Sequence, residues 1–220
     1  MKTINNYIDH TALKPTTSQK DIKTLCEEAK QHRFYSVCVN GHYVPLAKAL
    51  LAKSNVKVCA VVGFPLGAMA TEVKVFEAKK AIADGADEID MVLNIGMLKS
   101  ENFVNVYTDI RDVKLAIGNK VLKVILEISE LSKNEIIKAC QICLDAKADF
   151  IKTSTGFSKS GATLTAVKMI RKTVKKGAKI KASGGIKTLE VAEKYLEAGV
   201  DRLGCSAGVS IMEELQKKNS

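Results

Sequence analysis

One lysine stands inside a short apolar segment of the sequence. The stretch Asp149-Phe150-Ile151-Lys152-Thr153-Ser154-Thr155-Gly156-Phe157 begins as a strand and ends as a loop rich in hydroxyl groups and glycine. Burial disfavours the charged form of a lysine, so a lysine at the end of a buried strand is either ion-paired or a nucleophile. We interpret Lys152 as a nucleophile that attacks a carbonyl carbon.

A second lysine and an aspartate are predicted to lie beside this nucleophile. Lys181 falls in the next predicted strand with the same inward parity, and Asp90 ends an earlier one. A free lysine has a pKa of about 10.4, and lowering it by about three units costs roughly 4 kcal/mol. A second cation at about 4–6 Å and partial desolvation could together supply that energy. We therefore expect Lys181 to keep Lys152 neutral enough to attack, and Asp90 to partner Lys181 and move protons.

The alternative interpretation is a buried Lys–Asp–Lys ion network that only stabilises the fold. It would be favoured for one lysine, but two lysines and an aspartate at one rim favour chemistry. A second motif supports this: Ser183-Gly184-Gly185-Ile186-Lys187 and Gly204-Cys205-Ser206-Ala207 follow the last two predicted strands. Glycine exposes backbone N–H groups, and many barrels bind phosphate in these two loops. Two ordinary tight turns are the alternative for this motif.

Eight strand–helix units are predicted to position these groups, at spacings of about 20–35 residues. The fold class is α/β, a single (β/α)8 TIM barrel over residues 1–220 with a short N-terminal strand and helix leading in. An open doubly wound sheet is the alternative, but no glycine-rich fingerprint follows the first strand. Strands are expected at 7–9, 36–39, 57–62, 88–92, 121–127, around 150–152, 179–182 and 202–204. Helices are expected at 18–31, 43–53, 71–83, 102–117, 132–147, 162–176, 188–197 and 207–215, with Ser18, Thr71, Ser132 and Thr188 as N-caps.

The other polar and cysteine residues do not form a convincing second site. Asp9-His10-Thr11 suggests a metal site or a triad, but no acidic cluster accompanies the histidines, so no metal is expected. Cys140 and Cys143 share one face of a predicted helix, which favours core packing. Cys38 is interpreted as a packed thiol, and Glu127 as a candidate partner for a lysine.

The composition argues against nucleic-acid and membrane partners. The formal net charge is +10, yet the 34 lysines and arginines are scattered and mixed with 24 acidic residues. A nucleic-acid surface usually concentrates arginine and aromatic residues on one face. No apolar run could span a bilayer, and the N-terminus lacks a signal-peptide region. We expect a soluble, cytoplasmic protein with reduced cysteines.

Motifs along nearly the whole chain resemble those of the deoxyribose-phosphate aldolase family, which are class I aldolases. The resemblance is carried by residues 8–15 (IDHTALKP), 62–67 (VGFPLG), 88–94 (EIDMVLN), 150–157 (FIKTSTGF), 181–186 (KASGGI) and 204–208 (GCSAG). It implies reversible cleavage of 2-deoxy-D-ribose 5-phosphate to glyceraldehyde 3-phosphate and acetaldehyde, without metal or organic cofactor. It also implies a homo-oligomer, with a dimer as the expected form.

The resemblance also implies a role for each candidate residue. Lys152 would form the Schiff base, Lys181 would perturb it, Asp90 would transfer protons with Lys181 and a water, and Asp9 would support them. Phosphate would be bound by a set of loop residues: Thr155, Gly156, Gly184, Gly185 and Ser206. A transaldolase-like enzyme with a ketose donor is the alternative enzyme, and a basic nucleic-acid-binding protein is the alternative outside enzymes.

Three positions depart from the family pattern. Phe157 stands where some members have a lysine, so Lys159 and Lys187 are the nearest cations to the phosphate loops. Ala207 stands where some members have a second serine. The tail 216–220 lacks the tyrosine that assists proton transfer in some members, and water is expected to take that role.

Overall fold

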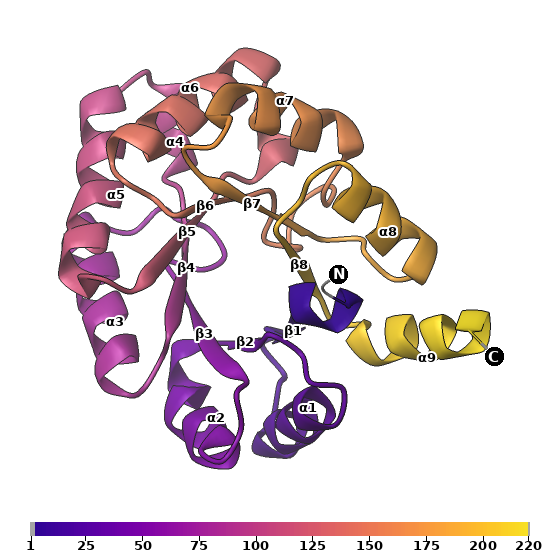
Figure 1. The fold of residues 1–220 in the computed structure, drawn as a ribbon. Helices are drawn as coiled ribbons and strands as arrows, with labels where there is room; N and C mark the ends of the chain where they lie inside the picture. The colour runs from indigo at the N-terminus through magenta and orange to yellow at the C-terminus, as the bar shows by residue number, and fades with distance from the viewer. Residues whose placement is uncertain (1–2, 220) are drawn as a thin grey trace.

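Eight parallel strands form the centre of the molecule and close into a barrel. The computed structural model describes residues 3–219, so Met1, Lys2 and Ser220, the ends of the expected 1–220 domain, lie outside the described residues. Each strand pairs with the next in the sequence, and β8 pairs with β1 to close the ring (Figure 1). The strands are β1 (Ile8–Ala12), β2 (Ser36–Val39), β3 (Lys57–Val62), β4 (Glu88–Val92), β5 (Val121–Ile125), β6 (Phe150–Lys152), β7 (Lys179–Ser183) and β8 (Arg202–Cys205).

Helices surround the barrel, and a short 3-10 helix, η1 (Ile4–Tyr7), leads into β1 (Figure 1). The closed ring confirms the predicted (β/α)8 TIM barrel and excludes the open doubly wound sheet. The α-helices are α1 (Gln19–Gln31), α2 (Val44–Leu51), α3 (Thr71–Ala83), α4 (Ile95–Lys99), α5 (Phe103–Ile117), α6 (Lys133–Asp145), α7 (Leu164–Val174), α8 (Leu189–Glu197) and α9 (Gly208–Asn219). Two further 3-10 turns are η2 (Gly41–Tyr43) and η3 (Ile128–Glu130).

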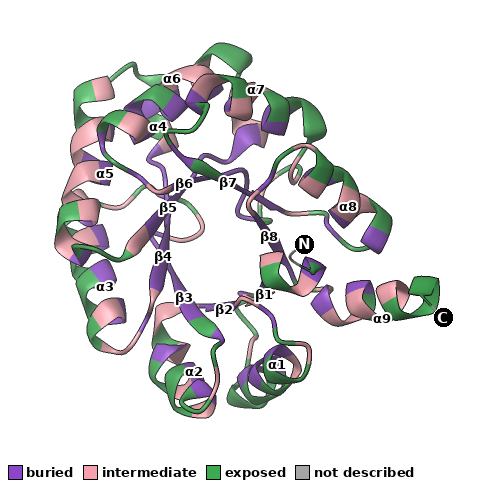
Figure 2. Ribbon diagram, viewed as in Figure 1, coloured by how far each residue is buried: buried purple, intermediate pink, exposed green. Residues whose placement is uncertain are grey.

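The strands are buried along almost their whole length (Figure 2). Successive side chains of a strand point to opposite faces. One row of side chains in each strand therefore packs against the helices, and the other row points into the barrel interior. In β4, Ile89 and Met91 belong to the apolar core, whereas Glu88 and Asp90 alternate with them and contact polar side chains of other strands. Alternation within a strand therefore places charged groups inside the barrel.

Helix caps follow the sequence pattern at most of the predicted positions. Ser18 and Ser132 each form a capping box with the acidic residue three positions later, and Thr188 caps α8. Thr71 was the wrong cap, because Ala70 occupies the N-cap position of α3. The Thr71 hydroxyl instead donates a hydrogen bond to the Asp109 carboxylate at 2.9 Å, joining α3 to α5.

Two local features depart from the predicted elements. The fifth strand ends at Ile125 rather than at residue 127, because Glu127 has a left-handed backbone with φ 57° and ψ 65°. The five-residue helix α4 follows β4, capped by the Asn94 side chain, which accepts from the Met97 N–H. Such a short helix has too few turns to show a helical hydrophobic period.

The described chain contains no helix with both the length and the apolar character needed to cross a membrane. Within residues 3–219, all six cysteines are buried and form no disulfide. Cys140 and Cys143 lie in the apolar core, as the packing interpretation predicts.

Candidate active site

Three lysines from three different strands converge on one aspartate inside the barrel. Asp90 Oδ2 lies 2.8 Å from Lys152 Nζ and 2.8 Å from Lys181 Nζ, and Asp90 Oδ1 lies 2.8 Å from Lys123 Nζ. The register explains the convergence, because Asp90 pairs with Lys123 across β4–β5 and Lys152 pairs with Lys181 across β6–β7. The structure therefore brings together Lys152, Lys181 and Asp90, as the sequence predicts.

The arrangement differs in one respect from the expected lysine pair. Lys152 and Lys181 share the same oxygen of Asp90, so their nitrogens are less than about 6 Å apart, within the range where like charges interact. The carboxylate between them, however, offsets part of that repulsion. Lys181 therefore acts on Lys152 through Asp90 and not as an isolated cation.

Asp9 extends this cluster towards the start of the chain. Its Oδ2 lies 2.5 Å from Lys181 Nζ, and its Oδ1 accepts from Arg202 at 2.8 Å and from the Ser36 hydroxyl at 2.6 Å. Glu88 completes the cluster, 2.5 Å from Lys123 and 3.3 Å from Arg202.

Sequence reasoning missed three members of the cluster: Lys123, Glu88 and Arg202. Each lies in a strand with inward parity, and that parity was the signal available to find them. With these members included, four cations face three carboxylates: Lys123, Lys152, Lys181 and Arg202 against Asp9, Glu88 and Asp90. The cluster therefore holds one more basic group than acidic groups.

The carboxylates of Asp90 and Asp9 stay ionised. Burial alone would raise the pKa of Asp90, but Lys123, Lys152 and Lys181 outweigh it and hold that pKa well below its usual range. Burial opposes ionisation of Asp9 in the same way, and Lys181 and Arg202 nevertheless lower its pKa. Burial would lower the pKa of Lys181, whereas Asp9 and Asp90 raise it above its ordinary value, so Lys181 remains an ammonium ion.

These shifts predict how stability depends on pH. A carboxyl group with a lowered pKa in the folded state stabilises the fold above its unfolded pKa and loses that contribution as the pH falls. We expect the free energy of unfolding to hold down to about pH 5 and then to decrease, with Asp9 and Asp90 each adding up to about 1.4 kcal/mol per pH unit. Urea unfolding at a series of pH values measures this slope. A slope that Asp9→Asn leaves unchanged would contradict the assignment.

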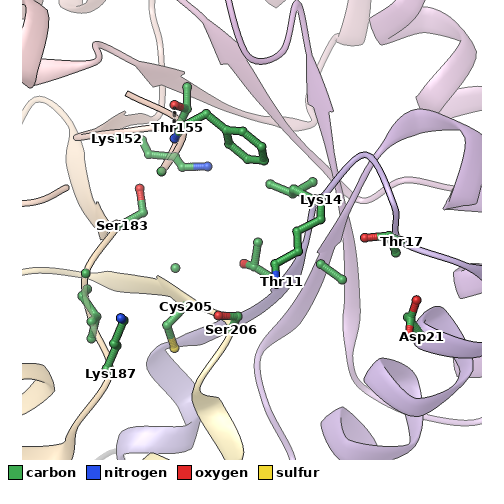
Figure 3. Close-up of a pocket in the computed structure, with 18 of the residues that line it drawn as sticks. Thr11, Lys14, Thr17, Asp21, Lys152, Thr155, Ser183, Lys187, Cys205 and Ser206 are labelled. Carbon is green, nitrogen blue, oxygen red and sulfur yellow. Dashed lines mark hydrogen bonds between the residues drawn. The ribbon is translucent and has the colours of Figure 1, made fainter. Parts of the chain in front are cut away.

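A pocket of about 630 Å³ opens at the carboxyl end of the barrel above Lys152 (Figure 3). Lys152 is the member of the cluster that lines it, while Asp9, Asp90 and Lys181 lie behind Lys152 and are fully buried. All five residues expected to bind phosphate line the same pocket: Thr155, Gly156, Gly184, Gly185 and Ser206.

Three glycines of the pocket have backbones that suit an anion site. Gly156, Gly184 and Gly185 have backbone φ values of 88°, 85° and 81°. Residues other than glycine adopt such values only with strain. A Cβ at Gly156 or Gly185 would meet no atom within 4 Å, so open space lies next to the backbone there. A ligand can therefore approach the backbone of Gly156 and Gly185 closely.

Two lysines supply positive charge to the pocket. Lys187 lies beside the glycine loop and Lys14 lies across the pocket from Lys152 (Figure 3). Lys159 pairs with Glu130 at 2.9 Å and does not line the pocket, so of the two cations expected from the sequence Lys187 is the one brought to the site. Lys14 was not anticipated, because its loop position has no periodic pattern.

Cys38 and Cys59 also lie against Asp90, at a position where the surrounding charges disfavour a metal ion. One ligand atom from each of the three residues falls within 4.8 Å of the others. The Asp90 oxygens already accept from three ammonium groups, which would repel a metal cation at that position. The position of Cys38 in a small apolar cluster with Leu13 fits its interpretation as a packed thiol.

Cys205 lines the pocket, and its reactivity gives a further prediction. Burial raises the pKa of its thiol to about 12, so the reactive thiolate is scarce at neutral pH. We expect iodoacetamide at pH 7.5 to modify Cys205 at least about a hundredfold more slowly than a free thiol of pKa about 8.5. Peptide mass mapping over time measures the rate, and rapid labelling of the folded protein would contradict the prediction.

Comparisons with known proteins match almost the whole chain to aldolases. The model of the DeoC/LacD family aldolases matches residues 3–214. A deoxyribose-phosphate aldolase of Caldicellulosiruptor saccharolyticus is 53% identical over 216 residues, covering 97% of this chain and 98% of the relative. Deoxyribose-phosphate aldolase 1 of Mesoplasma florum is 52% identical over 210 residues, covering 96% of each chain.

Solved structures are similar over the same length. A protein described as QR15, an aldolase, superposes with a TM-score of 0.96 at 45% identity, covering 100% of this chain and 98% of its own. The deoxyribose phosphate aldolase of Aeropyrum pernix, described as tetrameric, superposes with a TM-score of 0.90 at 32% identity, covering 98% of this chain and 92% of its own.

Proposed function

This chain belongs to the DeoC/LacD aldolase family, and from that membership and the site geometry we infer that it reversibly cleaves 2-deoxy-D-ribose 5-phosphate. The products are glyceraldehyde 3-phosphate and acetaldehyde. The enzyme is a class I aldolase, in which a lysine forms a Schiff base with the substrate. The relatives' names support this reaction and not the transaldolase-like alternative.

Lys152 is the Schiff-base lysine in this proposal. Its neutral amine attacks the aldehyde carbon of the open-chain sugar, and loss of water gives an iminium ion. The iminium withdraws electrons as the C2–C3 bond breaks and the C3 hydroxyl loses its proton, which releases glyceraldehyde 3-phosphate and leaves an enamine. A proton then adds at C2, and water releases acetaldehyde from the lysine.

Asp90 and Lys181 handle protons in this scheme, and Asp9 supports them. When Lys152 gives up its ammonium charge to react, Asp90 retains two of its three ammonium neighbours, Lys123 and Lys181. Asp90 is a better proton acceptor while Lys152 is a neutral amine, and it loses this gain when the iminium ion restores the positive charge, because a nearby positive charge lowers carboxylate basicity. A water carries the proton to and from C2, and Asp9 keeps Lys181 charged and in place.

The phosphate group binds at the other end of the pocket. Backbone N–H groups at Gly156, Gly184 and Gly185 and the Ser206 hydroxyl surround it, and Lys187 supplies the positive charge that Phe157 does not. Binding the phosphate far from the reacting carbons orients the substrate towards Lys152.

One observation carries the proposal: Lys152 alone of the charged cluster lines the pocket, with Asp90 and Lys181 directly behind it. Borohydride reduction with acetaldehyde tests it directly, because it converts a Schiff base into a stable N-ethyl lysine. Peptide mass mapping should place that group on Lys152. An adduct on another residue, or no adduct, would contradict the assignment.

Lys187→Gln tests the phosphate site. Losing one charged contact at the pocket should raise KM for 2-deoxyribose 5-phosphate about tenfold, equivalent to about 1.4 kcal/mol, and leave turnover of unphosphorylated 2-deoxyribose unchanged. Lys159→Gln is the matched control, because Lys159 pairs with Glu130 outside the pocket. Equal effects of the two substitutions would show that Lys187 does not bind the phosphate.

We also propose that the protein is a homo-oligomer, with a dimer as the simplest form, and that it works in the cytoplasm. Two large apolar side chains of α3, Val73 and Phe76, are 52% and 71% exposed and line one pocket together. Exposed apolar side chains that lie together are typical of an interface between subunits. The tetrameric Aeropyrum pernix relative supports self-association, and the unpaired cysteines suit a reducing compartment.

A further inference from the structure

Glu127 has an unusual backbone beside the active site. It follows β5 with φ 57° and ψ 65°, in the left-handed region that residues other than glycine rarely occupy. The residues on either side are fixed to β6, because the Leu126 N–H donates to the Lys152 carbonyl and the Ile128 N–H donates to the Thr153 carbonyl. Strain of this kind persists where surrounding structure imposes it, and it concentrates at functional sites.

The Glu127 side chain is unusual as well. It is only 3% exposed, and within residues 3–219 no lysine, arginine or histidine forms an ion pair with it. The expected partnership with a lysine was therefore wrong, because the left-handed backbone turns the side chain towards the β6–α7 loop instead. One oxygen, Oε1, is buried without a hydrogen-bond partner among the described residues. A buried carboxylate that is only half satisfied is costly and requires an explanation.

The other oxygen of Glu127 holds Thr155. Oε2 accepts from the Thr155 N–H at 3.2 Å and from the Thr155 hydroxyl. The Thr155 oxygen in turn accepts from the Phe157 N–H at 3.0 Å, so the chain turns around Gly156. Both the backbone and the hydroxyl of Thr155 are thereby fixed at the wall of the pocket (Figure 3).

A second glutamate contacts the outer part of the same loop and provides a comparison. Glu130 accepts from the Ser158 hydroxyl and from Lys159 Nζ. These contacts lie at the surface, where water and salt screen an ion pair and it adds little to stability. Glu127 differs because it is buried and because the residue that it holds lines the pocket.

From these contacts we infer that Glu127 is a positioning residue for the phosphate site: its carboxylate fixes Thr155 so that Gly156 presents its backbone amide to the substrate phosphate. The inference depends on the proposed function, since it assigns Gly156 to the phosphate. Glu127 touches neither the reacting carbons nor Lys152 in this scheme. Its removal therefore weakens binding of the phosphorylated substrate and leaves Schiff-base formation intact.

The test is a double-mutant cycle with Glu127→Gln and Thr155→Val. Each single substitution should raise KM for 2-deoxyribose 5-phosphate about tenfold, and the double substitution should raise it little further, because both remove the same contact. Thr155→Ser keeps the hydroxyl and should restore most of the affinity. The ratio of kcat/KM for 2-deoxyribose 5-phosphate to that for 2-deoxyribose should fall by the same factor. Glu130→Gln is the matched control and should change KM less than about twofold.

Glu127→Gly separates positioning from stability. Glycine suits the left-handed backbone, so this variant should melt no lower than Glu127→Gln, yet its KM for the phosphorylated substrate should rise as much. Additive effects in the cycle, or equal losses for phosphorylated and unphosphorylated sugar, would overturn the inference. Borohydride trapping of acetaldehyde on Lys152 should proceed in every variant. If the unaltered protein failed to trap, the proposed function would fall, whereas normal trapping with unchanged KM values would reject only the role of Glu127.

Discussion

Lys152→Ala is expected to abolish aldol turnover, with a loss on the order of 10⁴-fold or more. The amine is the group that bonds to the substrate, and no other described lysine of the cluster reaches the pocket. Lys152→Arg should fail equally, because a guanidinium group stays protonated near neutral pH and cannot attack a carbonyl. Coupled measurement of glyceraldehyde 3-phosphate formation gives the rate.

The two Lys152 variants also separate chemistry from folding. Lys152→Arg keeps a cation beside Asp90, so it should preserve the balance of the cluster better than Lys152→Ala does. Circular dichroism and thermal melting should show a folded protein in both cases. Borohydride with acetaldehyde should leave both variants unlabelled at residue 152. Substantial turnover by either variant would reject Lys152 as the Schiff-base residue.

Asp90→Asn is expected to have the second-largest effect. Removing the charge leaves three buried ammonium groups without their shared carboxylate, and it removes the group that passes protons to water. We expect turnover to fall by about 10²–10⁴-fold. Stability should fall by about 3–5 kcal/mol, because a buried cation that loses its partner is strongly destabilising. Steady-state kinetics and urea unfolding measure the two losses separately.

Asp109→Asn is the matched control for this variant. Asp109 forms a buried ion pair with Lys74 at 2.5 Å, between α3 and α5 and outside the catalytic cluster. Its substitution should cost similar stability while the folded protein retains most of its turnover. If both variants lost activity in proportion to stability, Asp90 would be a structural group and the proton-transfer role would be wrong.

The sequence was sufficient to predict the barrel and the centre of its site. Lys152 and Lys181 share inward parity on neighbouring strands, and a closed barrel brings such residues to one place. Lys123 and Arg202 follow the same rule but have no distinctive motif, so their parity within the strand was the one local signal that separated them from surface cations. Their importance depends on contacts with Asp90 and Asp9, which are far away in the sequence.

Backbone geometry explains the errors that remain. The left-handed backbone at Glu127 turns the Glu127 side chain towards the β6–α7 loop. Residue-type preferences do not predict such a backbone conformation at a glutamate. The same limit applies to Thr71, whose hydroxyl donates a hydrogen bond to Asp109 on α5 instead of capping the N-terminus of α3. Both outcomes depend on contacts between residues that lie far apart in the sequence, and local sequence patterns do not predict such contacts.

The pairing of β8 with β1 has a consequence for how the enzyme is made. Asp9 is translated long before Arg202, its partner across the closed ring, because 193 residues separate them in the sequence. A nascent chain that stops before β8 therefore leaves Asp9 and Glu88 without that guanidinium group. The guanidinium contacts to Asp9 and Glu88 therefore form only once β8 has been synthesised and has paired with β7 and β1.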